Sequence, residues 1–192
     1  MTGDLSGKVP VMVRAAHIAA RRLGYEQSCI DEVGQLLQVL ASQFPGETIA
    51  EIGGGCGVGT AWLASGLAAG AKLITVDNNE AAVESARSQL HDHVDVEILL
   101  GDWQMILQRG PFAMLFVDVS EAKARYIDEV IDALRPGGIA VLDDLTPLDQ
   151  WPESWHDQTD TLRRTWLEHP RLRSVEVLVT PRDSVILATR SR

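Results

Sequence analysis

The chain is poor in cysteine and in basic residues. Its 192 residues include only 2 cysteines, Cys29 and Cys56, which are too few for a disulfide framework and show no metal-ligand spacing. Lysine and arginine number 17 against 27 aspartates and glutamates, so the formal net charge is −10. Proteins that bind nucleic acid neutralise phosphates with a basic face, and this balance argues against such a partner.

Long apolar runs are also absent. No stretch is long enough to span a bilayer, and polar or charged residues interrupt both 1–8 and 9–20, unlike a signal peptide. These features predict a cytoplasmic protein that has no membrane partner. Length and ordinary composition predict a single domain over 1–192, with a helical N-terminal cap over 1–46 and a core over 47–192.

The chain does contain a glycine-packed stretch, residues 48–60. A short apolar strand that includes Glu51 runs into glycines at 53, 54, 55, 57 and 59, and a helix is expected to follow. Glycine permits positive φ and close approach of the backbone to a ligand, and the first turn of a helix presents unpaired N–H groups. The stretch therefore predicts a strand–turn–helix unit that cradles a nucleoside cofactor.

The glycine spacing bears on which cofactor that is. The NAD fingerprint is G-x-G-x-x-G, and the nearest match, which starts at Gly55, ends in Thr60 instead of glycine. Gly53, Gly55 and Gly57 instead follow G-x-G-x-G. NAD places its anionic pyrophosphate at such a turn and has no cationic group there to attract Glu51, whereas S-adenosylmethionine (SAM) has an ammonium and a sulfonium. From the motif alone, a second interpretation stays open, in which the stretch is an ordinary glycine-rich turn of another α/β domain.

The run from Glu51 to Gly59 resembles motif I of the class I SAM-dependent methyltransferases. The resemblance implies that Gly53, Gly55 and Gly57 approach the cofactor. It also implies that Glu51 acts at the methionine end of SAM, through backbone amides or water.

Strand and helix patterns alternate after residue 48, which predicts a parallel, doubly wound sheet. The expected strands are 48–52, 72–76, 95–100, 112–117 and 139–142, and the expected helices are 11–23, 28–44, 57–69, 80–90, 101–108, 122–134 and 157–168. Two further strands, 174–179 and 184–189, are close enough in sequence to form an antiparallel hairpin. The predicted fold class is α/β: a Rossmann-like, doubly wound, mostly parallel seven-stranded sheet with an antiparallel C-terminal hairpin, preceded by two N-terminal helices.

An acid stands at or just after the end of each predicted parallel strand, where open α/β sheets bind ligands. These acids are Glu51, Asp77, Asp102, Asp118 and the pair Asp143-Asp144. Asp77, roughly 20 residues beyond the glycine turn, is placed to accept hydrogen bonds from both ribose hydroxyls. Asn78 is expected to assist it, and Asp102 is expected beside the adenine amine. Trp103 either stacks on the adenine or packs in the core.

A narrower resemblance covers the second half of the chain. Phe116-Val117-Asp118, Ala124-Arg125-Tyr126 and residues 134–144 are similar to the catechol and caffeoyl-CoA O-methyltransferase family. The resemblance implies that Asp118, Asp143 and Asp144 bind a divalent cation, with Mg²⁺ suited to oxygen donors. Such a cation lowers the pKa of a substrate hydroxyl. Asp118 is then expected to contact the cofactor and to be a catalytic residue.

Two residues depart from that family pattern. The family has Asp-Asn where this chain has Asp143-Asp144, which adds a negative charge. The family also has a lysine three positions after the strand-four aspartate, and this chain has Glu121 there. Lys123 follows closely, but on a helix that starts at that point its side chain is expected to face elsewhere. The general base is therefore left unassigned.

The resulting hypothesis is a SAM-dependent methyltransferase that transfers a methyl group to a hydroxyl oxygen of a small-molecule acceptor, with Mg²⁺ assistance. The alternatives are a metal-independent small-molecule methyltransferase and a SAM-binding protein without transfer activity. Trp151, Trp155 and His156 lie where the family shapes its acceptor pocket, although core packing explains them equally well. The family is often dimeric through its N-terminal helices, and the apolar face of 30–40 is compatible with a homodimer or with packing on its own sheet.

Overall fold

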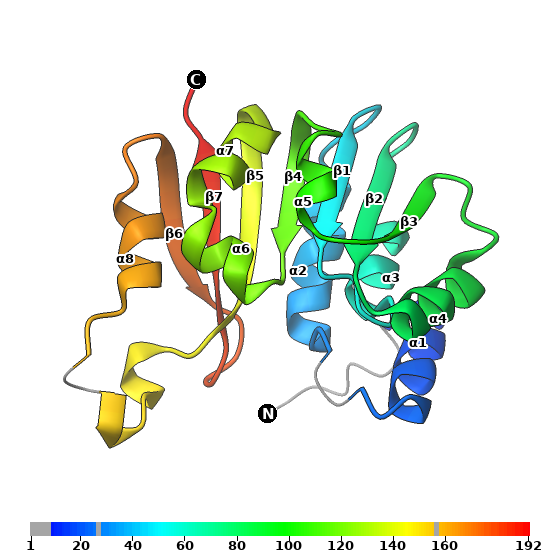
Figure 1. The fold of residues 1–192 in the computed structure, drawn as a ribbon, viewed down its shortest axis with the longest axis horizontal. Coiled ribbons are helices and arrows are strands. Elements are labelled where there is room, and N and C mark those ends of the chain that lie inside the picture. Colours follow the sequence, from blue (N-terminus) through cyan, green and yellow to red (C-terminus); the bar gives the residue numbers. More distant parts are fainter. Residues whose placement is uncertain (1–8, 26–27, 156–157) are drawn as a thin grey trace.

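The structure is a computed structural model that describes residues 9–25, 28–155 and 158–192. The described strands are β1 Thr48–Ile52, β2 Lys72–Asp77, β3 Val96–Leu100, β4 Phe112–Val117, β5 Leu134–Leu145, β6 Leu172–Leu178 and β7 Ser184–Arg190. They form a 7-stranded sheet in the order β3-β2-β1-β4-β5-β7-β6 (Figure 1). The pairs from β3 to β5 are parallel, and β7 pairs antiparallel with both β5 and β6. The predicted fold class is confirmed.

The strand order reverses between β1 and β4. From β1 the chain builds outward through β2 to β3, then returns to place β4 on the other side of β1. Helices that leave two such neighbouring strands pass to opposite faces of the sheet, which opens a crevice at their carboxyl ends. The cofactor site is expected at this point in any open α/β sheet.

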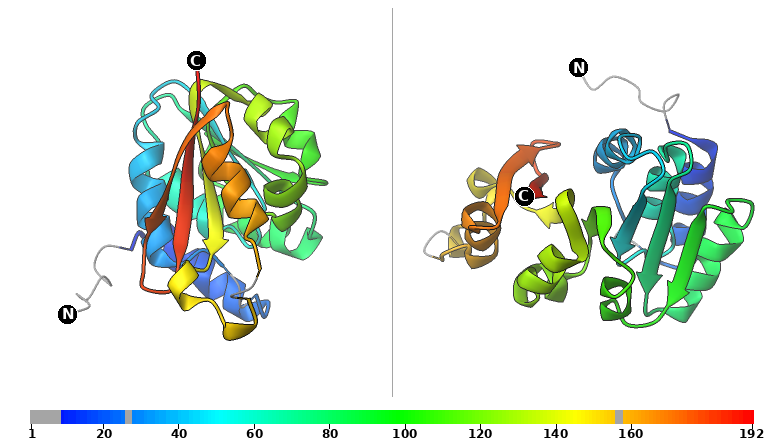
Figure 2. Two further views of the ribbon diagram at one scale, coloured as in Figure 1. Left: turned by 90° about the vertical axis from the view of Figure 1, so that its left-hand side faces the viewer. Right: turned by 90° about the horizontal axis from the view of Figure 1, so that it is seen from above.

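Helices cover both faces of the sheet (Figure 2). One face carries α1 Val11–Arg22, α2 Asp31–Ala41, α3 Val58–Ser65 and α4 Glu80–Leu90, and the other carries α5 Gln104–Leu107, α6 Ser120–Arg125, α7 Ile127–Ala133 and α8 Thr161–Glu168. The central strand β4 is buried along its whole length: Met114 and Phe116 pack into the first layer, and Leu115 and Val117 into the second. Alternation with a period of two residues is what divides one apolar strand between two layers.

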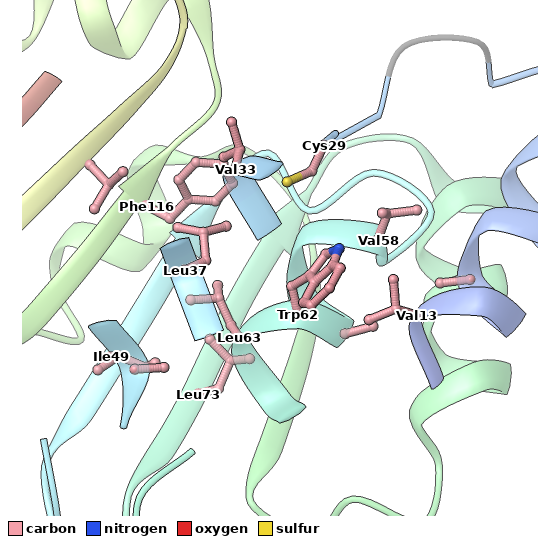
Figure 3. Packing of buried hydrophobic residues seen from close by; sticks show 14 of the residues in the cluster. Val13, Cys29, Val33, Leu37, Ile49, Val58, Trp62, Leu63, Leu73 and Phe116 are labelled. Atoms are coloured by element: carbon pink, nitrogen blue, oxygen red, sulfur yellow. The ribbon is translucent and has the colours of Figure 1, made fainter. Parts of the chain in front are cut away.

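The N-terminal helices pack on the chain's own core. Val33 and Leu37 of α2 are fully buried beside Trp62 of α3, and Val13 of α1 reaches the same cluster (Figure 3). Gly34 is the contact point, because a Cβ built there would lie 2.2 Å from the Trp62 ring. Much of the apolar face of α2 is thus used within the chain. The predicted homodimer is not tested.

Several boundaries differ from the sequence-based ones. The single helix expected over 122–134 is two helices, α6 and α7, which meet at Tyr126 with φ −121° and ψ 39°. Strand β5 begins earlier than residue 139, at Leu134, because Phe112 of β4 pairs with Leu134 before a register shift. Helix α2 starts at Asp31, later than residue 28.

Two expectations concern residues near or outside the described ranges. Of the helix expected over 157–168, Asp157 lies outside the described residues. The described helix α8 begins at Thr161, where the Asp160 side chain accepts a hydrogen bond from the backbone N–H of Arg163. Residues 1–8 of the expected cap are likewise outside the described part of the chain. Within the described residues, no helix is long and apolar enough to cross a membrane.

Substitution of Gly34 tests the packing of α2 on α3. Gly34→Ala is expected to lower the free energy of unfolding by about 1–3 kcal/mol, because the new methyl group overlaps the buried Trp62 ring. The loss should appear although alanine is the better helix former. Val39→Ala, an exposed change on the same helix, is the control and should alter stability by no more than about 0.5 kcal/mol. Urea denaturation measures both; equal stability of the two variants would contradict this packing.

Candidate cofactor and acceptor site

The glycine turn between β1 and α3 lies close to the end of β4. Its residues Gly53, Gly55 and Gly57 all have positive φ. At Gly53 a Cβ would stand 2.7 Å from the carbonyl oxygen of Asp118, so any larger residue would push the turn away from β4. Two N–H groups of the turn, those of Gly53 and Gly54, donate to the Val76 carbonyl of β2. The turn is therefore held over the crevice between β1 and β4.

A cavity of about 690 Å³ lies at this crevice. This volume is in the range typical of cofactor and ligand pockets. Its lining combines the glycine turn with side chains from the segment before α2 and from the ends of four parallel strands: Tyr25, Cys29, Glu51, Asp77, Asp118, Asp143 and Asp144. The acids that the sequence places at strand ends thus largely converge on one cavity. Such a lining favours a cofactor that carries positive charge.

Asp77 is oriented by the turn it faces. One carboxylate oxygen accepts a hydrogen bond from the backbone N–H of Gly55 at 2.9 Å, and the other accepts from the N–H of Asn79 at 2.8 Å. Asn79 in turn caps α4, because its side-chain oxygen accepts a hydrogen bond from the backbone N–H of Ala82. The Asp77 carboxylate is therefore fixed at the cavity wall, where it can accept further hydrogen bonds from hydroxyl groups.

Three predicted cofactor contacts lie outside the lining of this cavity. Asn78 is exposed next to Asp77. Asp102 is also exposed, and its carboxylate accepts a hydrogen bond from the backbone N–H of Gln104. Trp103 is buried in the second core layer, with its ring edge-on to Tyr126 at 5.2 Å, so packing describes it better than stacking in the cavity. The adenine role of Asp102 stays a prediction.

Glu51 is buried beneath the turn. It is 1% exposed, and one of its oxygens accepts hydrogen bonds from the hydroxyls of Thr60 at 2.5 Å and Thr75 at 2.7 Å. Burial raises the pKa of Glu51 from its ordinary 4.5 to about 7, against the two hydrogen bonds, which lower it. The two threonines come from α3 and β2, and nothing in the local sequence pairs them with Glu51.

Lys123 occupies the centre of the acidic cluster at the ends of β4 and β5. Its Nζ donates to the carbonyl oxygen of Asp143 at 2.9 Å and to the carboxylate of Asp144 at 3.3 Å, and lies 3.8 Å from Asp118 Oδ1. The expectation that Lys123 faces elsewhere was wrong. Helix α6 starts at Ser120, so Lys123 lies one turn inside it and points back to β5, while Glu121 is exposed.

Two of the acids near Lys123, Asp118 and Asp143, have raised pKa values. Burial, followed by the neighbouring Asp144 carboxylate, raises the pKa of Asp118 well above its usual range, although Lys123 opposes this. Burial also raises the pKa of Asp143 to about 6. Asp144 has φ 61°, a left-handed conformation that aspartate tolerates better than most residues. It falls where the β5–β7 register shifts, and this bend brings its carboxylate to Lys123.

The arrangement does not fit the predicted metal site. In the described residues no group of three or more His, Cys, Asp or Glu side chains is arranged to hold a metal ion. The carboxylates of Asp118 and Asp144 and the main-chain carbonyl of Asp143 instead surround the ammonium of Lys123. No reaction step is therefore assigned to a metal here.

A second cavity of about 230 Å³ adjoins the first. Both are lined by Ser120, Asp143 and Asp144, and Lys123 also lines the second. Its far wall contains Trp151 and Trp155, whose rings meet edge-on at 5.7 Å. Two of the three aromatic residues predicted for an acceptor pocket are thus beside the acidic cluster. His156 lies outside the described residues.

Sequence reasoning missed some residues of the main cavity. Tyr25 lies over the glycine turn, with its ring 3.3 Å from where a Cβ of Gly55 would be. Burial, followed by the charge of Asp77, raises the pKa of Tyr25. Cys29 and Cys56 also line the cavity as free thiols. Tyr25 and Cys29 lie in segments without a recognisable motif. Cys56 lies within the glycine turn, and this position could have indicated that it lines the cavity.

Comparisons with known proteins identify the family and the fold of the chain. A family described as "Methyltransferase domain" matches residues 50–145, which is half of the chain. An O-methyltransferase from Bacillus cereus, solved in complex with SAH, superposes with a TM-score of 0.78 at 23% identity and covers 95% of this chain and 92% of that one. The O-methyltransferase TomG from Streptomyces achromogenes, solved with SAM, also has a TM-score of 0.78 at 23% identity, with 96% and 91% covered.

The chain belongs to the methyltransferase domain family, and its fold is that of the class I SAM-dependent enzymes. Among curated proteins, it is 30% identical over 118 residues to the "Probable O-methyltransferase Rv1220c" of Mycobacterium tuberculosis (strain ATCC 25618 / H37Rv). That match covers 57% of this chain and 53% of the relative, so the chain spans about half the length of the curated relatives it matches.

Glu51→Gln tests the buried carboxyl. The pKa of Glu51 in the folded protein is about 7, above the ordinary 4.5. The stability that the protonated Glu51 side chain contributes is therefore complete below about pH 4.5 and is lost as the pH rises through 7. Between pH 5 and pH 8 the free energy of unfolding of the wild type should therefore fall by about 2–3 kcal/mol more than that of Glu51→Gln, because glutamine does not titrate.

Urea denaturation at pH 5, 6, 7 and 8 measures this difference. Glu84→Gln, an exposed change on α4, is the control and should follow the wild type at every pH. Parallel pH profiles for the wild type and Glu51→Gln would show that Glu51 titrates normally.

Proposed function

We propose that the protein is a SAM-dependent O-methyltransferase that acts on a small, hydroxyl-bearing acceptor. The observation that carries the proposal is the pair of adjoining cavities that share the Asp143–Asp144 wall. A cofactor in the larger cavity and an acceptor in the smaller one would meet at this wall. The family match supports methyl transfer as the reaction.

SAM suits the larger cavity in both shape and charge. The Asp77 carboxylate, which the Gly55 N–H orients, would accept hydrogen bonds from the two ribose hydroxyls. The glycine turn leaves room for the methionine end, beneath which Glu51 is buried. A sulfonium and an ammonium are attracted to a cavity lined with carboxylates, and NAD offers neither. These contacts support SAM over a dinucleotide.

The acceptor reaction follows from the position of the second cavity. The acceptor hydroxyl oxygen attacks the methyl carbon of SAM, the carbon–sulfur bond breaks, and its electron pair stays on sulfur as S-adenosylhomocysteine forms. The hydroxyl proton passes to a carboxylate of the acidic cluster and then to solvent. Holding oxygen, carbon and sulfur in line supplies most of the rate in such a displacement.

The position of Lys123 bears on the two alternative functions that the sequence left open. The reading as a SAM-binding protein without transfer depended on the missing lysine, and Lys123 supplies a cation at the reacting edge. The metal-independent alternative gains support from the same residue. A cytoplasmic location, a homodimer and the absence of nucleic-acid partners stay predictions.

Asp77→Asn tests the cofactor assignment. We expect S-adenosylhomocysteine to bind more weakly by about 1–3 kcal/mol, or about 5- to 150-fold, because asparagine accepts fewer hydrogen bonds from the ribose. Asp95→Asn, an exposed change before β3, is the matched control and should leave the affinity unchanged. Calorimetric titration measures both, and equal affinity in the two variants would remove Asp77 from the site.

Trp155→Ala tests the acceptor cavity. With an acceptor found by screening phenols and catechols, KM for the acceptor should rise about 3- to 10-fold, the usual worth of one aromatic contact. S-adenosylhomocysteine affinity should not change, because Trp155 lines only the smaller cavity. Leu148→Ala, exposed in the same loop, is the control. An unchanged acceptor KM for Trp155→Ala would place the acceptor elsewhere.

A further inference from the structure

We propose that the ammonium of Lys123 takes the place that a divalent cation has in the catechol-type enzymes, so that methyl transfer here needs no metal. The proposal rests on the proposed O-methyltransferase function and names the group that receives the acceptor oxygen. It is carried by the position of Lys123 among Asp118, Asp143 and Asp144.

The Lys123 side chain is held in one place. It is 4% exposed, and its Nζ is bound to the Asp143 carbonyl and the Asp144 carboxylate. The backbone is fixed as well: the Lys123 N–H donates to the Val119 carbonyl, and the buried Trp166 donates its indole N–H to the Lys123 carbonyl at 2.8 Å. The ammonium is therefore a built part of the cluster.

The charges of the cluster explain both departures from the catechol-type pattern together. Asp144 adds a negative charge where that family has asparagine, and Lys123 adds a positive charge that this acid contacts. A buried charge is tolerated when it is paired and hydrogen-bonded. A divalent cation bound to the same carboxylates would lie against the ammonium and be repelled by it.

The ammonium is also placed to act on the acceptor. Lys123 lines the smaller cavity at its junction with the larger one, next to Asp143 and Asp144. Of its three N–H donors, two are used by Asp143 and Asp144 in the described part of the chain. Asp118 Oδ1 lies 3.8 Å from Nζ, beyond hydrogen-bond distance, so we assign the third donor to the acceptor oxygen.

In the methyl transfer, Lys123 stays protonated and stabilises the oxygen as the hydroxyl proton leaves. The proton passes to the Asp144 carboxylate, whose side chain is 73% exposed and can release it to water. The oxygen–carbon bond forms as the carbon–sulfur bond breaks. The cation therefore assists by charge and position, as an oxyanion donor does.

Among the described residues that line the two cavities, Arg163 is the other cationic side chain besides Lys123. Its guanidinium lines the smaller cavity but is committed to Asp160, Glu176 and the Thr146 carbonyl. It is thus held by partners on its own side of the cavity, away from the shared acidic wall. Lys123 is the cation that both geometry and pairing assign to the reacting oxygen.

Titration with Mn²⁺ tests the proposal directly. Mn²⁺ takes the oxygen-donor sites that Mg²⁺ takes, and its binding is followed by electron paramagnetic resonance. The wild type should bind it only weakly, in the millimolar range, and Asp144→Asn should not change that. Lys123→Met, which removes the charge from the three acids, should bind Mn²⁺ at least about 10-fold more tightly.

The matched control is Lys72→Met, the same change at an exposed lysine at the start of β2, and it should behave as the wild type. S-adenosylhomocysteine binding, measured on every variant, reports folding and tests the cofactor separately. If the wild type fails to bind it, the proposed function fails whatever the metal does. If Lys123→Met does not fold, Lys123→Gln, which can still donate to Asp143, replaces it.

Two results would overturn the proposal. The first is micromolar Mn²⁺ binding by the wild type that Asp144→Asn abolishes, since the acids would then hold a metal beside Lys123. The second is a folded Lys123 variant that binds Mn²⁺ no better than the wild type, since the ammonium would then not be what fills the site.

Discussion

The site depends on one constraint: several carboxyl groups are partly or wholly buried at the carboxyl edge of the sheet. Glu51, Asp118 and Asp143 lie at or below the surface of one cavity, and an ionised carboxylate taken out of water must find partners. The fold meets this need in three ways. Threonine hydroxyls bind Glu51, backbone N–H groups bind Asp77, and the Lys123 ammonium pairs with the carboxylates of Asp118 and Asp144.

These hydrogen bonds and ion pairs link the sheet to the helices that pack on it. Thr60 lies on α3 and Thr75 on β2, so the contact of Glu51 ties the first strand–helix unit to its neighbour. Lys123 ties α6 to β5 in the same manner, and Trp166 of α8 holds its backbone from the other side. The polar site and the two apolar layers therefore depend on each other, because Thr60 and Lys123 bind the acids from helices that pack against the sheet.

The periodic parts of the fold could be predicted from the sequence. Alternating apolar strands and helices, with the hairpin at 172–190, determine the order of elements, and the glycine turn and Asp77 locate the cofactor crevice. The break at Tyr126 was not predictable, because no glycine or proline marks it. Lys123 was misjudged for a related reason: α6 starts at Ser120, two residues before the expected start at 122, and two residues correspond to roughly half a helical turn. The partners of Glu51 depend on tertiary contacts that no local pattern encodes.

Calorimetric titration of the wild type with S-adenosylhomocysteine, with NAD as the control, is the direct test of whether this crevice binds SAM. We expect micromolar binding of S-adenosylhomocysteine at a stoichiometry of about one per chain, in the presence of EDTA as well as without it, and no binding of NAD. Binding of NAD, or of neither compound, would contradict this expectation, and the glycine turn would then be a feature of the scaffold alone.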